Sequence, residues 1–395
     1  MNASSLLRGV RRLPGLRLWH RVPLLDRWLL QELMAPLFFG IAAFTAVSLS
    51  VGVVFDLVRR VAESGLPAWA AVQVLVLKLP GFLVLSFPMA TLMATLLAYS
   101  RLSGNCELTA LRSVGVRSWR MVLPALVLSL LMSVTTFVFN DVVVPQANLQ
   151  AADTLERAMG SAIAAEKGDD TLYSNFADVQ GPNGKSTRKM VQLFYARYYL
   201  KGLMVDVTLL DFTQPGQRQM LTAKTGIWDE KSAMWNFWDG RLITINEVNG
   251  NTTTARFSHY VYAMGKGPVE VAMLPTDATM MTVGQAVRAE RLLREANNLK
   301  EARRMRVRIQ EKFALPAICL VFGLIGSSLG VRPNARTSRS QGFGISVMLI
   351  FGYYLMSFIF SSLGVTGSLP PILAGWLPVL IGLGIGLLLL RKASR

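Results

Sequence analysis

Three cationic side chains lie inside or directly beside apolar stretches that are long enough to cross a membrane. Arg59 and Arg60 follow the first such stretch, and Lys78 lies inside the second. An arginine fork bonds phosphate oxygens bidentately, so the Arg59–Arg60 pair could meet the phosphates of an anionic lipid. The pair could equally be an interfacial anchor that reaches lipid headgroups. An unpaired ammonium within a membrane is costly, so Lys78 must face a ligand cavity or a structural partner, for which Asp56 is a candidate.

The polar stretch between the second and third apolar segments predicts a short amphipathic helix over residues 103–115. Gly115 supplies its stop. One charged and three apolar positions recur at helical spacing: Glu107, Leu108, Leu111 and Val114. Such a helix could simply lie at the membrane interface. It could instead dock into a groove on a cytoplasmic motor protein, with Glu107 as its charged anchor, and the residues alone leave both interpretations open.

The residue types most often used for catalysis or metal binding do not form a set in this sequence. His20 and His259 fall on opposite sides of the expected membrane, and Cys106 and Cys319 form neither a disulfide pattern nor a metal cluster. Gly181–Ser186 resembles a phosphate-binding loop, but the position of the first Walker A glycine holds a valine. We therefore expect no catalytic residue, no metal and no cofactor in this chain, and any ATP and Mg²⁺ would be bound by a partner.

Membrane helices must position the residues described above. The chain has 395 residues, of which 52% are hydrophobic and 16% are charged, and these values fit a polytopic membrane protein. A helix needs about 20 apolar residues to cross the hydrocarbon core. Six segments approach or exceed that length: about 33–58, 70–99, 118–140, 313–331, 342–363 and 370–390.

The net charge of +17 follows the membrane topology, which argues against nucleic-acid binding. Basic residues precede the first helix and fill alternate connections, so the positive-inside rule places both termini in the cytoplasm. The basic positions are Arg8, Arg11, Arg12, Arg17, Arg21 and Arg27; Arg101, Arg112, Arg117 and Arg120; Arg332, Arg336 and Arg339; and Arg391, Lys392 and Arg395. The long segment 141–312 then lies outside the cytoplasm, where its length exempts it from the charge rule.

The segment between the third and fourth helices has the pattern of a β domain. Val191–Leu200 and Leu203–Phe212 predict two strands that meet at a Lys201-Gly202 hairpin turn. Pro215-Gly216, Asp239-Gly240 and Asn249-Gly250 indicate further turns, with strand-like runs such as Met234–Trp238 and Arg241–Val248 between them. Short strands at this spacing suggest an antiparallel sandwich or jelly roll. From residue 282 the pattern becomes helical and strongly basic, which is typical of a solvated linker helix or of a surface for an anionic headgroup.

At the level of motifs, the chain resembles the lipopolysaccharide-export permeases of the LptF/LptG (YjgP/YjgQ) family. Three stretches carry the resemblance: Lys78–Pro88 with Arg101-Leu102 and Glu107–Gly115, then Glu311–Pro316, then Gly367–Pro378. Together with the six-helix layout and the β insert, the resemblance covers nearly the whole chain.

The resemblance implies a non-catalytic membrane subunit of an ABC transporter that extracts lipopolysaccharide from the inner membrane. Cytoplasmic ATPase subunits, a second permease copy or paralogue and periplasmic β-jellyroll bridge proteins would be its partners. The segment 103–115 would be the coupling helix, with Glu107, Leu108, Leu111, Arg112 and Gly115 as its site residues. Arg59 and Arg60 match a region where the family places basic residues toward lipid phosphates, and Lys78 is a further candidate for the lipid site.

The expected fold is therefore a six-helix bacterial inner-membrane protein with an inserted periplasmic jelly-roll-like domain. Its expected function is lipopolysaccharide export. The alternatives are that it exports another anionic lipid, or that it is a non-transporting scaffold with a partner-binding β domain. The expected parts are a basic cytoplasmic segment (1–32), helices 1–3 with the coupling helix (33–140), the β domain (141–281), a basic linker helix (282–312) and helices 4–6 (313–395).

Overall fold

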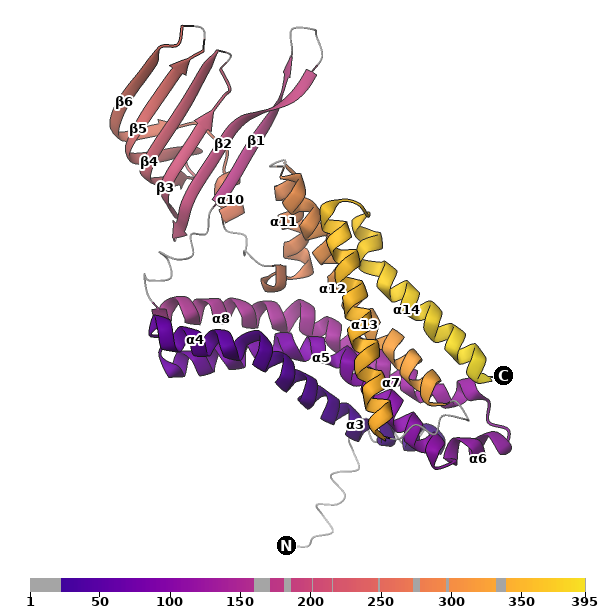
Figure 1. The fold of residues 1–395 in the computed structure, drawn as a ribbon. Coiled ribbons are helices and arrows are strands. Elements are labelled where there is room, and N and C mark those ends of the chain that lie inside the picture. The colour runs from indigo at the N-terminus through magenta and orange to yellow at the C-terminus, as the bar shows by residue number, and fades with distance from the viewer. Residues whose placement is uncertain are drawn as a thin grey trace, which may run out of the picture.

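A computed structural model describes residues 23–159, 171–180, 186–200, 202–214, 216–247, 249–272, 278–295, 298–331 and 339–394. Six helical segments in this part are long and apolar enough to cross a membrane. A six-stranded antiparallel sheet lies between the third and the fourth of them (Figure 1). The expected fold class, a helical membrane protein with an inserted β domain, is confirmed. Most of the basic amino-terminal segment, together with Arg332 and Arg336, lies outside the described residues.

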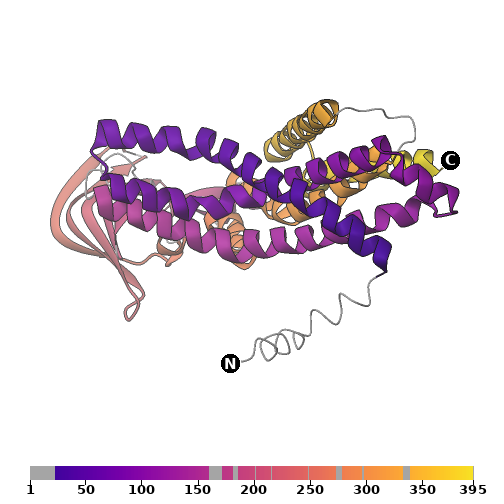
Figure 2. The same ribbon diagram turned by 90° about the horizontal axis from the view of Figure 1, so that it is seen from below.

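The first three membrane segments are longer than their apolar cores. Their elements are α3 (Leu24–Leu49), the π-helical η2 (Ser50–Val54) and α4 (Phe55–Ser64); α5 (Ala68–Gly104); the short α6 (Glu107–Ser113); and α7 (Ser118–Val138), the π-helical η3 (Phe139–Val143) and α8 (Val144–Met159). Because polar residues flanking an apolar core are still good helix formers, these helices continue past the expected membrane boundaries. As a result α4, the start of α5 and α8 run together toward the sheet (Figure 2).

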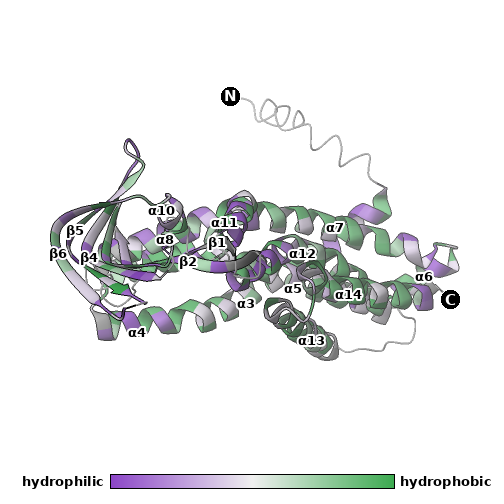
Figure 3. Ribbon diagram, turned by 90° about the horizontal axis from the view of Figure 1, so that it is seen from above, coloured by the Kyte–Doolittle hydropathy of each residue, from purple (hydrophilic) through white to green (hydrophobic). Residues whose placement is uncertain are grey.

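The second triplet is built around one central helix. Its elements are α11 (Val283–Glu295), α12 (Leu299–Gly330), α13 (Arg339–Thr366) and α14 (Pro371–Ser394). The expected linker over 282–312 is therefore divided between α11 and the start of α12. Helix α12 packs against α5, α7, α11 and α14, and hydrophobic residues dominate the membrane helices, whereas hydrophilic ones gather at α6 and α11 (Figure 3).

Glycines set how closely α12 approaches α5. A Cβ on Gly326 would lie 2.9 Å from the Leu92 carbonyl oxygen, and a Cβ on Gly330 would lie 2.4 Å from the Tyr99 Cβ and 3.0 Å from the Ser100 nitrogen. Small residues at such positions let helix backbones pack closely within a membrane. The two halves of the membrane domain are therefore in direct backbone-to-backbone contact.

Replacing Gly330 by alanine is expected to lower the free energy of unfolding by about 1–3 kcal/mol, because the added methyl group must push α12 away from α5. This cost exceeds the gain of about 1 kcal/mol in helix propensity that alanine brings. Gly352→Ala is the matched control, since a Cβ there meets no atom within 4 Å, and it should keep the propensity gain. Thermal unfolding in detergent would measure both, and equal melting temperatures would contradict the close-packing account.

The sheet is a single meander. Its strands are β1 (Thr171–Gln180), β2 (Ser186–Leu200), β3 (Leu203–Asp211), β4 (Gln217–Asp229), β5 (Met234–Asn246) and β6 (Thr252–Tyr262), in the spatial order of the sequence. Two shorter helices, α10 (Gly267–Ala272) and the 3₁₀-helical η4 (Ala278–Met280), lead back to α11. Short connections join neighbouring antiparallel strands, so the described strands form one curved sheet where the sequence suggested a sandwich or jelly roll. The curved sheet encloses an apolar cluster around Trp235, Phe237 and Phe194.

Two of the expected hairpin turns are present in the described residues. Leu200 pairs with Leu203 around Gly202, whose φ is +93°. Gly250 has a φ of +67° and donates its N–H to the Asn246 carbonyl between β5 and β6. Lys201 of the first turn, Pro215 of the expected Pro215-Gly216 turn and residues 181–185 lie outside the described residues.

The expected turn at Asp239-Gly240 is wrong, because both residues lie inside β5. Asp239 belongs to a crease, defined as the row of adjacent residues that strand pairing skips in β2 to β6: Arg197, Asp206, Lys224, Asp239 and Ser258. Asp206 and Asp239 each have a φ of +51° there, and such local bends increase the curvature of a sheet. The crease thus folds the sheet around its apolar cluster.

Candidate functional site

A cavity that combines apolar walls with charged groups lies in the half of the helix bundle nearer the sheet. It encloses about 660 Å³ between η2, α4, α5, η3, α8, η4 and α12. Its charged and amide-bearing lining residues are Asp56, Arg60, Lys78, Asn140, Asn148, Arg308, Glu311 and Lys312. Such a cavity inside a membrane bundle fits a ligand with both an apolar and an anionic part.

Both π-helical segments contribute to the cavity wall. η2 provides Gly52 and Val53, and η3 provides Asn140. Single π-turns inside α-helices occur frequently at functional sites, because they rotate the side chains that follow them. Gly52 is required locally: a Cβ at this position would lie 2.7 Å from the ring of Phe82 on α5.

Four cationic and two acidic side chains line the cavity among the described residues, which leaves an excess of positive charge. The Arg60 Nε donates to Asp56 Oδ2 at 2.9 Å, and the Arg308 Nη1 donates to Glu311 Oε2 at 2.8 Å. Lys312 is 8% exposed. An anionic ligand entering this cavity would meet a positive field in surroundings that screen charge poorly.

The structure separates the two arginines that the sequence treats as a pair. Arg60 lines the cavity, and its side chain is 30% exposed. The Arg59 side chain is 74% exposed, does not line the cavity, and its Nε donates to Glu63 at 2.8 Å. Of the two, Arg60 is placed to meet a ligand inside the bundle and Arg59 is placed at the surface.

Lys78 lies on the cavity wall. Asp56, its suggested partner, lines the same cavity and accepts a hydrogen bond from Arg60. Lys78 and Asp56 therefore share one cavity wall, and a role of Lys78 in lipid binding stays a prediction.

Two further cations of the cavity, Arg308 and Lys312, were not singled out in the sequence. Both lie at the end of the basic segment that precedes the fourth apolar stretch. The Lys312 Nζ donates to the Met281 carbonyl at 2.6 Å and to the Asn140 carbonyl at 3.4 Å. The sequence did contain a signal for Lys312: an ammonium directly beside a membrane span suggests a functional position by default.

A second candidate site lies at the opposite end of the bundle, called the distal end here, where α6 and the end of α14 lie away from the sheet (Figure 1). Within the expected segment 103–115, helix α6 begins at Glu107, and residues 103–104 belong to α5. The Glu107 carboxylate is partly exposed and accepts a hydrogen bond from the Asn105 Nδ2 at 3.0 Å. A carboxylate at a helix N-terminus is favoured by the helix dipole and stays available to a partner cation.

The apolar positions of α6 do not share one environment. Leu108 is 2% exposed and packs into the apolar core of the bundle, and Leu111 packs against that core. Val114 is 83% exposed, and Gly115 ends the segment with a φ of +92°. Of the four positions noted in the sequence, Glu107 and Val114 therefore reach the outer surface, together with the exposed Thr109, Ala110 and Ser113, whereas Leu108 and Leu111 hold the helix in place.

Arg112 turns toward the protein. Its Nη2 donates to the Val331 carbonyl at 2.9 Å and to the Ala393 carbonyl at 3.2 Å. These carbonyls lie at the C-terminal ends of α12 and α14. Cations are stabilising at helix C-termini because the last carbonyls carry partial negative charge.

Comparison with known families adds an independent observation to this geometry. The model of the lipopolysaccharide export system permease LptF/LptG family matches residues 27–392. The chain belongs to the LptF/LptG permease family. A search among curated proteins finds no match. Both candidate sites fall inside the matched range, so the family relationship covers the cavity, α6 and the β insert of this LptF/LptG-family permease.

Among the described residues, no group of three or more His, Cys, Asp or Glu side chains is placed to hold a metal ion. The charged groups of the two candidate sites are arginine and lysine donors in the cavity and one carboxylate at the start of α6.

Proposed function

We propose that this permease is a membrane subunit of an ABC transporter that extracts lipopolysaccharide from the inner membrane. ATP and Mg²⁺ would be bound by separate cytoplasmic ATPase subunits that dock on α6. The observation that carries the proposal is the positively charged cavity between the membrane helices, within a chain whose family is an export-system permease.

The cavity supports binding of the phosphorylated headgroup of such a lipid. Arginine and lysine donors on α4, α5 and α12 surround a space with apolar walls, so phosphates would find cations while the acyl chains stay in contact with apolar surface. Movement of the lipid out of the cavity, away from α6, would then bring it to the curved sheet. The sheet would connect with periplasmic bridge proteins of similar fold.

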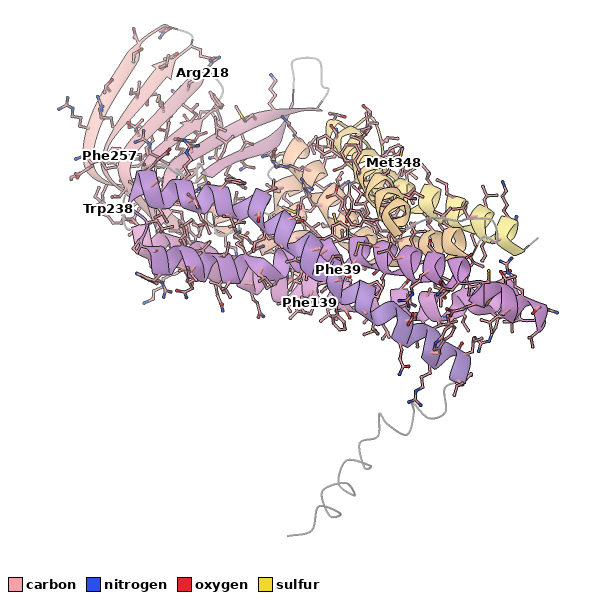
Figure 4. All side chains as sticks on the ribbon, turned by 60° about the horizontal axis from the view of Figure 1, so that its bottom comes forward. Phe39, Phe139, Arg218, Trp238, Phe257 and Met348 are labelled. Carbon is pink, nitrogen blue, oxygen red and sulfur yellow. The ribbon has the colours of Figure 1, made fainter. Side chains whose placement is uncertain are left out.

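Exposed apolar side chains on α3 and α13 support contact with a second permease, either another copy or a paralogue. Phe39 on α3 is 62% exposed, and Met348 on α13 is 79% exposed (Figure 4). These side chains are covered in a membrane either by acyl chains or by a neighbouring subunit. The proposed orientation places both chain termini in the cytoplasm and the sheet in the periplasm, in agreement with the positive-inside rule.

Replacing Arg60 by glutamine is expected to raise the lipid concentration that half-maximally stimulates ATP hydrolysis by about tenfold. A hydrogen bond to a charged group contributes about 1.5–3 kcal/mol, and 1.4 kcal/mol corresponds to a factor of ten. Arg59→Gln is the matched control, because Arg59 is the adjacent arginine outside the cavity. The measurement is lipopolysaccharide-dependent ATP turnover of the purified complex in nanodiscs.

Equal effects of the two substitutions would contradict the assignment of the cavity and favour a general headgroup-anchoring role. The wider proposal is tested by purification in mild detergent. An ATPase subunit and a phosphorylated glycolipid, identified by mass spectrometry, should accompany the permease. A scaffold protein would bring neither, and an exporter of another anionic lipid would bring the ATPase with a different lipid.

A further inference from the structure

The chain connects α6 only to the first helix triplet. α5 precedes α6 and α7 follows it, so a displacement of α6 acts through covalent links on those two helices. Helices α12 and α14 belong to the second triplet and are reached from α6 only through non-covalent contacts. A movement that starts at α6 can therefore reach the other half of the membrane domain in two ways: indirectly, through the packing of α5 and α7 against α12, or directly, through contacts that α6 itself makes with α12 and α14.

Arg112 provides a polar link of this kind. Through one nitrogen it bonds the Val331 carbonyl of α12 and the Ala393 carbonyl of α14, which lie 219 and 281 residues further along the chain. The Arg112 Nε is buried and bonds no group among the described residues, so the guanidinium is held through its Nη2. A positive charge shared by two helix C-termini holds both ends at a fixed distance from α6.

Apolar packing supports the same link. Leu108 of α6 and Val331, the residue that ends α12, belong to one apolar cluster and are 2% and 1% exposed. Tight packing of this kind transmits displacement, because protein interiors have low compressibility. The Arg112 hydrogen bonds and this shared apolar cluster thus both connect α6 to the second triplet.

We propose that Arg112 is a positioning residue that joins α6 and the distal ends of α12 and α14 into one rigid unit. The inference rests on the proposed function, in which the ATPase docks on α6. ATP-driven displacement of α6 then moves both triplets together and closes the cavity, and Arg112 acts inside the permease without contacting the ATPase. In its absence the ATPase still binds and turns over, but its motion reaches the second triplet only indirectly, through the packing of α5 and α7 against α12, and closure of the cavity is no longer coupled tightly to it.

Ser118 offers a matched control for this proposal. Its hydroxyl donates to the same Ala393 carbonyl at 3.0 Å, but it lies at the start of α7. Ser118→Ala removes a hydrogen bond from the end of α14 while leaving the connection to α6 intact. An effect that comes merely from loosening α14 would appear in both variants.

The experiment compares wild type, Arg112→Met, Arg112→Lys and Ser118→Ala in the complex with its ATPase and companion permease. Proteoliposomes that contain lipopolysaccharide are used, and lipid released and ATP hydrolysed are both counted. For Arg112→Met we expect ATPase association and turnover within about twofold of wild type, with lipid released per ATP at least tenfold lower. Arg112→Lys should recover part of this ratio, because its ammonium still donates to a carbonyl, and Ser118→Ala should keep the wild-type ratio.

A wild-type ratio of lipid to ATP in Arg112→Met would overturn the inference. So would loss of ATPase association, which would place Arg112 in the docking surface, or an equal loss in Ser118→Ala. If Arg112→Met does not fold, Arg112→Lys decides: an intermediate ratio supports the inference and an unchanged ratio overturns it. The proposed function itself has a separate test: if the wild-type complex releases no lipid when ATP is added, the proposed function is wrong.

Discussion

Replacing Glu107 by arginine is expected to abolish ATP-driven lipid export while the folded permease remains in the membrane. The Glu107 carboxylate lies at the start of α6, is partly exposed, and accepts a hydrogen bond from Asn105. Charge reversal at a docking surface places like charges together, which costs several kcal/mol in binding. Co-purification of the ATPase and lipid release from proteoliposomes measure the effect, and normal values for both would remove Glu107 from the site.

Two neighbouring substitutions separate docking from local structure. Asn105→Ala removes the internal hydrogen bond but keeps the carboxylate, so export should stay close to wild type. Glu107→Gln keeps an oxygen that can accept from Asn105 but removes the charge, so export should fall to an intermediate level. If Asn105→Ala were as damaging as Glu107→Arg, the carboxylate would act by shaping the turn between α5 and α6 rather than by binding a partner.

The membrane helices were predictable because hydrocarbon imposes a simple rule on them. A span of about 20 apolar residues has few alternatives to a helix in a bilayer. The hairpin around Gly202 was predictable for a similar reason, since two strands separated by two residues need a backbone with positive φ. In both cases a local signal had a single structural interpretation.

The Asp239-Gly240 pair had two interpretations, and the sequence could not distinguish them. An Asp-Gly pair indicates a position where positive φ is tolerated, which serves a hairpin turn and a bend within a strand equally well. What decides the outcome is the alignment of Asp239 with Lys224, Asp206 and Arg197 on neighbouring strands. That alignment depends on the pairing of strands far apart in the chain.

The cavity was only partly predictable because π-turns change the helical phase. Arg59 and Arg60 are adjacent, so their side chains point about 100° apart around a regular helix. The π-helical η2, residues 50–54, lies between them and the apolar core of α3. Extrapolating the 3.6-residue period from α3 therefore gives the wrong face, and the structure is needed to place Arg60 inside and Arg59 outside.

Arg112 illustrates the same limit at the distal end. Its spacing within 103–115 is compatible with a docking surface, and the resemblance to the family placed it there. The carbonyls that it bonds belong to residues 331 and 393, and no local pattern indicates that two helix ends converge on one short helix. The role of such a residue is set by tertiary packing.

Lys312→Met is expected to weaken both the fold and the lipid response. The Lys312 ammonium lies where three parts of the chain meet: it bonds the Asn140 carbonyl in η3 and the Met281 carbonyl before α11, and it belongs to α12. Next to it, Asp141 Oδ1 accepts the Val283 N–H at 2.6 Å. These contacts fix the points at which the sheet-bearing insert leaves and rejoins the bundle.

Methionine has a similar volume but cannot donate to the two carbonyls. Hydrogen bonds from a charged group contribute about 1.5–3 kcal/mol, and part of this loss is offset because a buried ammonium no longer has to be desolvated. A net decrease of about 2 kcal/mol in the free energy of unfolding should follow, and amide hydrogen exchange should rise in residues 139–143 and 281–286. Removing one cation from the cavity should also raise the half-saturating lipid concentration.

Arg308→Gln separates the two effects of Lys312. Arg308 lines the same cavity, but its side chain is 49% exposed and its recorded partner is Glu311 in its own helix. The substitution should therefore change the lipid response while leaving the melting temperature and hydrogen exchange of the junction at wild-type values. If Lys312→Met matched Arg308→Gln in both stability and exchange, Lys312 would be a ligand contact alone. The difference in melting temperature and hydrogen exchange between Lys312→Met and Arg308→Gln measures how much the Lys312 hydrogen bonds stabilise the junction between the membrane cavity and the sheet.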